Sequence, residues 1–200
     1  VGHYSIPLPV VLSDSMHGDM ASFELMTARI LDDEGREGLG YTYTLGAGAR
    51  AIHSVMHSDM APFLMDRDET RIEEIWHGLW WKLHYAGRGG LVIHALSAID
   101  IALWDLLGKR TSLPLWRLLG GADPKVKAYA GGIDLMFSLD DLLAQTDQNL
   151  SKGFRAIKMK VGRDNLHEDV ERIKTMRNHL GSGFPLMVDA NMRWTVDDAI

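Results

Sequence analysis

Two short segments near the end of the chain carry polar side chains at a spacing that could do chemistry. Lys158 and Lys160 lie two residues apart in the segment AIKMKVG, and Asp189 and Asn191 lie two residues apart in the segment PLMVDANMRW. Side chains at positions i and i+2 of a β-strand point to the same face of the sheet. Each pair would therefore present its two side chains together, near the carboxyl end of its strand.

These groups suit the removal of a proton alpha to a carboxylate. Such a proton is very weakly acidic, because the carbanion adds a second negative charge to the substrate and needs strong electrostatic stabilisation. A divalent cation bound by Asp189 would supply it. A lysine serves as the base only when its pKa falls, and a second cation beside it has that effect. We expect Lys158 and the metal to act in this way on Lys160.

A simpler interpretation exists for each pair. Two lysines on an edge strand can both be solvated, and Asp and Asn are common in turns at strand ends. However, a strand between two helical segments of a parallel sheet is covered on both faces, which leaves little room for solvated lysines. The carboxyl ends of such strands are also where active sites assemble in parallel α/β folds.

Strands alternate with helices around these two segments. The apolar patterns predict strands over residues 126–130, 156–161 and 186–190, helices over residues 139–150 and 168–180, and another helix from Thr195 onward. Strands separated by helices of this length indicate βαβ units and a parallel sheet, either open or closed into a barrel. Three strands cannot close a barrel, so we expect the chain to be truncated.

The first part of the chain predicts an α+β domain. The pattern favours an antiparallel hairpin over residues 23–43 and helices over residues 72–83, with Asp68 as the N-cap, and over residues 91–108. Residues 13–20 and 46–48 are predicted to be loops. The segment LLGGADP, residues 118–124, ends helices with its glycines and proline. We therefore predict two domains, residues 1–122 and 123–200.

Three motifs resemble the enolase superfamily, in its mandelate racemase and muconate lactonizing enzyme branch. They are SAIDIALWDLLGKR (97–110), IKMKVG (157–162) and MVDANMRW (187–194), and the resemblance runs along essentially the whole chain. It implies an α+β capping domain followed by a (β/α)7β TIM-like barrel, of which residues 123–200 would be the first part. It also implies magnesium (Mg2+) as the cofactor and an enediolate intermediate.

The same resemblance implies a role for each candidate residue. Lys160 corresponds to the catalytic base and Lys158 to the lysine that assists it. Asp189 corresponds to the first of three carboxylate ligands to magnesium, and Asn191 to a residue near the substrate. The other two carboxylates, and the histidine and aspartate of a second acid/base, would lie beyond Ile200.

The substrate class is predicted from two loops that fall where the family's capping domain closes over its substrate, residues 13–20 and 44–50. The SDSM segment, the tyrosine-rich strand and the glycine loop are most similar to galactarate and talarate dehydratases, with His17 and Tyr43 as candidate contacts. We therefore predict a lyase that dehydrates an acid sugar. A racemase or epimerase, a cycloisomerase and an inactive structural homologue remain as alternatives.

Composition bears on the other classes of protein. The 27 acidic and 21 basic residues are spread evenly, without the basic face of a nucleic-acid binder. The absence of cysteine excludes disulfides, thiolate zinc sites and cysteine nucleophiles. No run of about 18 uninterrupted apolar residues predicts a membrane span, and no signal peptide is recognised. We expect a cytoplasmic homo-oligomer acting on a small carboxylate, without nucleic-acid or membrane partners.

Two other motifs predict sites only weakly. Gly46, Gly48 and Ala51 fit the dinucleotide-binding pattern GxGxxA, but the strand before them belongs to a hairpin and no second parallel strand follows closely. His53 and His57 have helical spacing for zinc but lack a third ligand nearby. We interpret these histidines as surface or packing residues.

Overall fold

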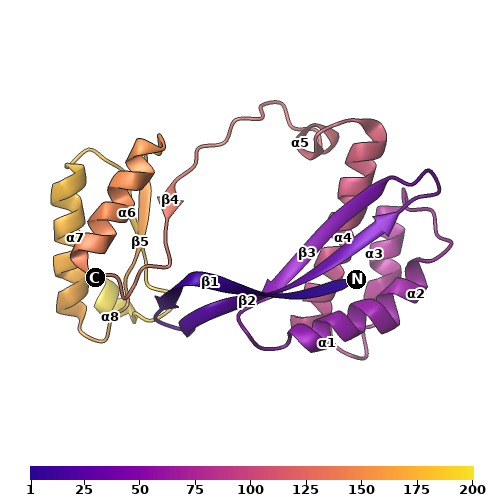
Figure 1. Cartoon of the computed structure of the whole chain (residues 1–200), viewed down its shortest axis with the longest axis horizontal. Helices are drawn as coiled ribbons and strands as arrows, with labels where there is room; N and C mark the ends of the chain where they lie inside the picture. Colours follow the sequence, from indigo (N-terminus) through magenta and orange to yellow (C-terminus); the bar gives the residue numbers. More distant parts are fainter. The chain divides into compact units, whose positions relative to one another are not determined.

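The computed structural model describes residues 1–200, and the chain divides into two compact units (Figure 1). The first consists of Val1–Pro7 and Ser22–Pro124, and the second of Leu8–Ala21 and Lys125–Ile200. The chain therefore crosses between the units near the predicted boundary after residue 122, and also after Pro7 and after Ala21. The assignment of residues 1–122 and 123–200 as domains stays a prediction, because compactness alone does not define a domain.

The first sheet contains three strands in the order β1-β2-β3: β1 (Gly2–Asp14), β2 (Gly18–Leu31) and β3 (Glu37–Thr44). The predicted hairpin is confirmed, since β2 pairs antiparallel with β3 around a turn in which the Asp32 carboxylate accepts the N–H groups of Glu34 and Arg36. The predicted loop over residues 13–20 is wrong. Only the turn Ser15–His17 separates β1 from β2, and the two strands extend into the predicted loop from both sides.

The helices of the first unit follow the sheet in sequence. They are α1 (Ala49–Ser54), the π-helix η1 (Val55–Met60), α2 (Ala61–Leu64), α3 (Ile72–Lys82), α4 (Gly90–Thr111) and α5 (Leu115–Leu118). The two predicted helices correspond to α3 and α4. The prediction of Asp68 as the N-cap is wrong: Arg71 holds that position, and the Asp68 carboxylate instead accepts hydrogen bonds from the backbone and hydroxyl of Thr70.

Helix α4 packs directly against β3 (Figure 1). A Cβ atom on Gly38 would lie 2.1 Å from the carbonyl oxygen of Ala102, and one on Gly40 would lie 2.0 Å from that of Ala98. Only glycine on the strand therefore permits this approach, and the small alanines on the helix complete it. Both alanines are fully buried in the core of the first unit.

Helix α4 is also long and apolar enough to span a membrane, judged by its length and mean hydropathy alone. The core helix of a water-soluble protein passes the same test, so one such helix is weak grounds for a span. Its apolar side chains have a partner within the protein. The buried ones, which belong to the core of this unit or extend it, are Val92, Ala95, Leu96, Ala98, Ile99, Ala102, Leu103 and Leu106.

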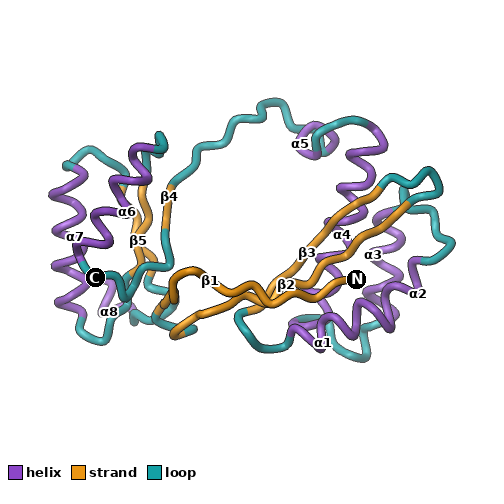
Figure 2. The backbone as a smooth tube through the Cα atoms, in the orientation of Figure 1, coloured by secondary structure: helices purple, strands orange, loops and turns teal.

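The second unit contains a parallel sheet in the order β4-β5-β6, formed by β4 (Ala130–Gly131), β5 (Ile157–Lys160) and β6 (Leu186–Asp189). Helix α6 (Leu139–Ser151) connects β4 to β5, α7 (Leu166–Leu180) connects β5 to β6, and α8 (Val196–Ala199) follows β6. Both connecting helices lie on one side of the strands (Figure 2). The predicted βαβ arrangement is confirmed.

Strand β4 is shorter than the predicted strand over residues 126–130. Ala130 pairs with Ile157, the first residue of β5, so the residues before Ala130 have no part of β5 opposite them. Val126 is accordingly 88% exposed. The apolar residues of β5 pack as predicted, since Ile157, Met159 and Val161 are buried with Leu142 of α6 and Met176 of α7.

Candidate active site

The two lysines and Asp189 are brought together by the register of two neighbouring strands. β5 and β6 run parallel, with Lys158 opposite Met187 and Lys160 opposite Asp189. The alternate residues of β5 are buried against the helices, so both lysines project from the other face. The predicted grouping at the carboxyl ends of these strands is therefore what the structure contains.

Lys160 is held by two oxygen atoms from the next strand and the loop after it. Its Nζ donates to Asp189 Oδ2 at 2.9 Å and to Asn191 Oδ1 at 2.6 Å. The side chain is only 9% exposed. An ammonium group with so little solvent needs a nearby anion, and Asp189 provides it.

Lys158 reaches the same carboxylate oxygen as Lys160. Its Nζ lies 3.0 Å from Asp189 Oδ2 and 5.4 Å from the centre of the Tyr129 ring. The hydrogen bond to Asp189 is the main reason that the pKa of Lys158 is raised above its ordinary value. Lys158 therefore stays charged at neutral pH and keeps a positive charge beside Lys160.

Asp189 is an ionised carboxylate that accepts three hydrogen bonds. Its pKa lies well below the usual range, chiefly because Lys160 donates to it and also because the backbone N–H of Asn191 and the Lys158 side chain do so. The backbone bond uses Oδ1, at 3.1 Å, whereas both lysines use Oδ2. The carboxylate of Asp189 is thus the shared anionic partner of both lysines at the end of β6.

The loop after β6 has an unusual backbone conformation. Asn191 and Met192 have φ values of 47° and 64°, in the left-handed region. Asn tolerates this region better than most residues, whereas a Met there is uncommon and strained. This backbone conformation places the Asn191 side chain at the end of β6, where it accepts a hydrogen bond from Lys160.

Sequence reasoning missed Asp134, which is 1% exposed. Its Oδ1 accepts a hydrogen bond from the backbone N–H of Lys160 at 2.8 Å. The signal that could have found it is its position: Asp134 follows β4 as Asp189 ends β6, so both carboxylates lie at carboxyl ends of strands in one parallel sheet.

The turn between β1 and β2 belongs to the second unit and lies at the same ends of the strands. Ser13 forms a parallel bridge with Asp134, and the Ser15 hydroxyl donates to the carbonyl oxygen of Ala190 at 2.8 Å. Asp14 is buried and contacts the His17 ring at 2.9 Å. The structure therefore brings His17 to the unit that contains the lysines.

The other predicted contact, Tyr43, lies in β3 of the first unit, where its ring meets Phe23 edge-on. A contact of Tyr43 with substrate stays a prediction.

His53 and His57 stack on one another at 6.0 Å between ring centres. No group of three or more His, Asp or Glu side chains in residues 1–200 could hold a metal ion by itself.

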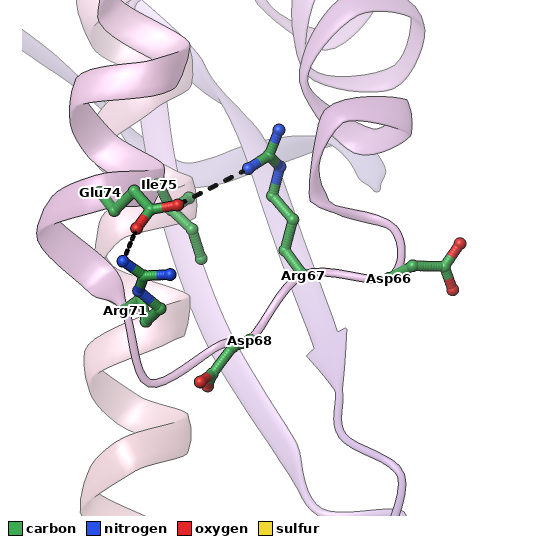
Figure 3. Close-up of a pocket in the computed structure, with 6 residues that line it drawn as sticks. All are labelled: Asp66, Arg67, Asp68, Arg71, Glu74 and Ile75. Atoms are coloured by element: carbon green, nitrogen blue, oxygen red, sulfur yellow. Dashed lines mark ion pairs between the residues drawn. The ribbon is translucent and has the colours of Figure 1, made fainter.

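A polar pocket of the first unit does not have the composition of this site (Figure 3). Glu74 forms ion pairs with both arginines of the lining, Arg67 and Arg71, and the lining contains no lysine. The Gly46–Gly48 loop follows β3, a strand of the antiparallel hairpin, and leads into α1. No second parallel strand follows in that unit, as the dinucleotide-binding pattern requires.

Asp189 has the properties of one magnesium ligand. Magnesium prefers oxygen ligands and is bound through one or two carboxylates together with water and substrate oxygens. Asp189 is ionised, faces away from the apolar core and already attracts two ammonium groups. Asp189 therefore fits magnesium in charge and atom type, and its role as a ligand stays a prediction.

Comparisons with known proteins agree with this arrangement. Residues 5–120 match the family model of the mandelate racemase / muconate lactonizing enzyme N-terminal domain, and residues 141–200 match the enolase C-terminal domain-like model. The chain is 57% identical over 197 residues to a 3,6-anhydro-alpha-L-galactonate cycloisomerase from Streptomyces coelicolor, covering 98% of this chain and 55% of that protein. It therefore spans about half the length of such relatives.

Solved structures show the same fold. A racemase from Streptomyces coelicolor with bound magnesium superimposes with a TM-score of 0.95 at 57% identity, covering 98% of this chain and 55% of that one. An L-talarate/galactarate dehydratase from Salmonella typhimurium, liganded with magnesium and L-lyxarohydroxamate, gives 0.92 at 34% identity, covering 98% and 52%. The chain thus belongs to the mandelate racemase and muconate lactonizing enzyme branch of the enolase superfamily.

Proposed function

We propose that the complete protein is a magnesium-dependent enzyme that removes the proton alpha to the carboxylate of an acid sugar. The observation that carries this proposal is the placement of the Lys160 ammonium group 2.9 Å from Asp189, in register across two parallel strands. A base and a metal ligand so close together can both act on one small carboxylate substrate.

Each residue of the site has a part in this proposal. Lys160, once deprotonated, takes the substrate proton at Nζ, and Asn191 Oδ1 fixes the direction of that atom. Lys158 stays charged beside it and stabilises negative charge that develops on the substrate. Asp189 would be one ligand of magnesium, which would supply positive charge beside the substrate carboxylate.

Dehydration of an acid sugar is the first candidate for the overall reaction. The chain is 36% identical over 203 residues to the Salmonella L-talarate/galactarate dehydratase. Loss of the alpha proton leaves electrons that can expel a hydroxyl group from the neighbouring carbon, with a proton added to form water. The proton for that hydroxyl must come from a second acid.

Cycloisomerisation is the second candidate, and the higher identity to the Streptomyces cycloisomerase favours it. It begins with the same proton abstraction, but a ring oxygen of the substrate leaves instead of water. Racemisation or epimerisation would return a proton to the same carbon. An inactive structural homologue would lack the proton abstraction altogether.

The complete protein, supplied with magnesium, tests these candidates against a library of acid sugars and anhydro acid sugars in D2O. NMR would detect exchange of the alpha proton, and the mass of the product would distinguish loss of water from isomerisation. Absence of both alpha-proton exchange and product formation with every substrate would refute the proposed function. We also propose a cytoplasmic homo-oligomer without nucleic-acid or membrane partners, as predicted from the sequence.

A further inference from the structure

Asp134 replaces the end of a strand beside Lys160. At the start of β5 the N–H of Ile157 donates to the carbonyl oxygen of Pro185, just before β6, at 3.0 Å, and just after β5 the N–H of Val161 donates to that of Asp189 at 3.1 Å. The N–H groups of the alternate residues therefore face β4. β4 ends at Gly131, opposite Lys158, so no strand residue is available to pair with Lys160.

The Asp134 side chain fills this gap in the hydrogen-bond pattern. Its Oδ1 lies 2.8 Å from the Lys160 nitrogen, and the bond is buried. A buried backbone N–H without an acceptor is strongly unfavourable, so the carboxylate fixes the end of β5 where a carbonyl of β4 would otherwise do so.

Asp134 is itself held from several directions. Gln145 of α6 donates to its Oδ2 at 2.9 Å, and the buried Arg172 of α7 donates to its carbonyl oxygen at 3.1 Å. Ser13 of β1 bridges to it in parallel fashion. The Cβ of a larger residue at Gly132 would lie 2.8 Å from Asp134 Oδ2, so the carboxylate fits closely into its surroundings.

We propose that Asp134 is a positioning residue for Lys160, acting on its backbone so that Nζ reaches the substrate side of the site. This inference rests on the proposed function, in which Lys160 is the base. One oxygen of the Asp134 carboxylate accepts a hydrogen bond from the Lys160 N–H, and the other accepts one from Gln145 of α6. The backbone carbonyl of Asp134 accepts one from Arg172 of α7. Its effect is therefore on the position of the base rather than on the substrate.

The test compares Asp134→Ala with Asp134→Asn in the complete protein with magnesium. Asn keeps an oxygen for the Lys160 N–H, and Gln145 can turn to present its own oxygen to the new amide. We expect Asp134→Ala to lower kcat about 10- to 100-fold with KM changed less than about threefold. Asp134→Asn should keep at least about a third of kcat. Equal kcat in the wild type and Asp134→Ala, or equal losses in the two variants, would overturn the inference.

If Asp134→Ala does not fold, Gln145→Leu tests the same positioning role with a smaller change to the protein. It removes the donor that holds Oδ2, so kcat should fall about 3- to 10-fold, a smaller loss than a full misplacement of the base produces. An unchanged kcat in Gln145→Leu would then count against the inference.

Hydrogen exchange separates this inference from the proposed function. In peptides that cover residues 157–161, Asp134→Ala should lose protection of one amide that the wild type and Asp134→Asn retain. If no acid sugar either exchanges its alpha proton or is converted to product, the proposed function fails. Unchanged protection in Asp134→Ala would overturn the positioning role whatever the substrate.

Discussion

Lys160 and Asp189 lie directly opposite each other in the parallel strands β5 and β6, and the Lys160 Nζ donates to Asp189 Oδ2 at 2.9 Å. Successive side chains of a strand alternate between faces, so a register shift of one residue would separate them. The buried side chains of Ile157 and Met159 oppose such a shift, because it would move them out of the core. Burial of the apolar face of β5 therefore keeps Lys160 in register with Asp189 on the polar face.

Replacing Lys160 with Ala in the complete protein should abolish exchange of the substrate's alpha proton. A positioned base contributes about 100-fold or more to such a step, so the loss should be at least that large. Deuterium incorporation followed by NMR measures it. Lys152→Ala, at the exposed end of α6, is the control and should exchange like the wild type. Retained exchange in Lys160→Ala would mean that another residue is the base for that stereoisomer.

Replacing Asp189 with Asn should weaken magnesium binding by at least about tenfold, since even residues that only support a metal ligand contribute that much. Calorimetric titration of the metal-stripped complete protein measures the affinity. Asp164→Asn is a matched control, because the Asp164 side chain is 96% exposed and pairs only with Arg193 among the ion pairs of the chain. Equal affinities in Asp189→Asn and Asp164→Asn would remove Asp189 from the ligand set.

Replacing Asp169 with Ala should destabilise the protein through the loop after β5. The fully buried Asp169 Oδ2 accepts the N–H groups of Gly162 and Arg163 at 2.8 and 2.9 Å. The buried Gly162 donor and the partly buried Arg163 donor would lose their acceptor, at a cost of about 2–4 kcal/mol in free energy of unfolding, which urea denaturation would measure. Asp169→Asn keeps an oxygen in the same place and should lose less. A loss as large in Asn as in Ala would show that charge, and not the acceptor, is what matters.

Acid should destabilise the turn between β1 and β2 through Asp14. Burial alone raises the pKa of Asp14, but hydrogen bonds from His17 and Met16 outweigh it and lower the pKa below the ordinary value of 3.8. Because the folded-state pKa is lowered, the stabilisation is fully present above pH about 4 and is lost as the pH falls through the folded-state value. Asp14→Asn should therefore flatten the fall of stability below pH 4. An unchanged acid slope in thermal unfolding would contradict this.

Much of the candidate site could be predicted because it depends on local periodicity. The alternation in AIKMKVG places Lys158 and Lys160 on one face whatever the surrounding fold, and helices α6 and α7 follow from their apolar spacing. β1 was missed because Pro7 and Pro9 disfavour a strand, although an edge strand such as β1 accommodates them. The helical segment from α1 to α2 was not predicted either, because no side-chain cap marks its start.

Sequence alone thus determined which side chains share a face and which elements carry them, because both depend on residues close together in the chain. Tertiary structure decided which distant residues meet. Asp134 bonds the backbone of Lys160 only because β4 stops after Gly131, and Ser15 reaches Ala190 only because the first turn belongs to the second unit. These contacts depend on where strands end in space, and no periodicity in the chain records that.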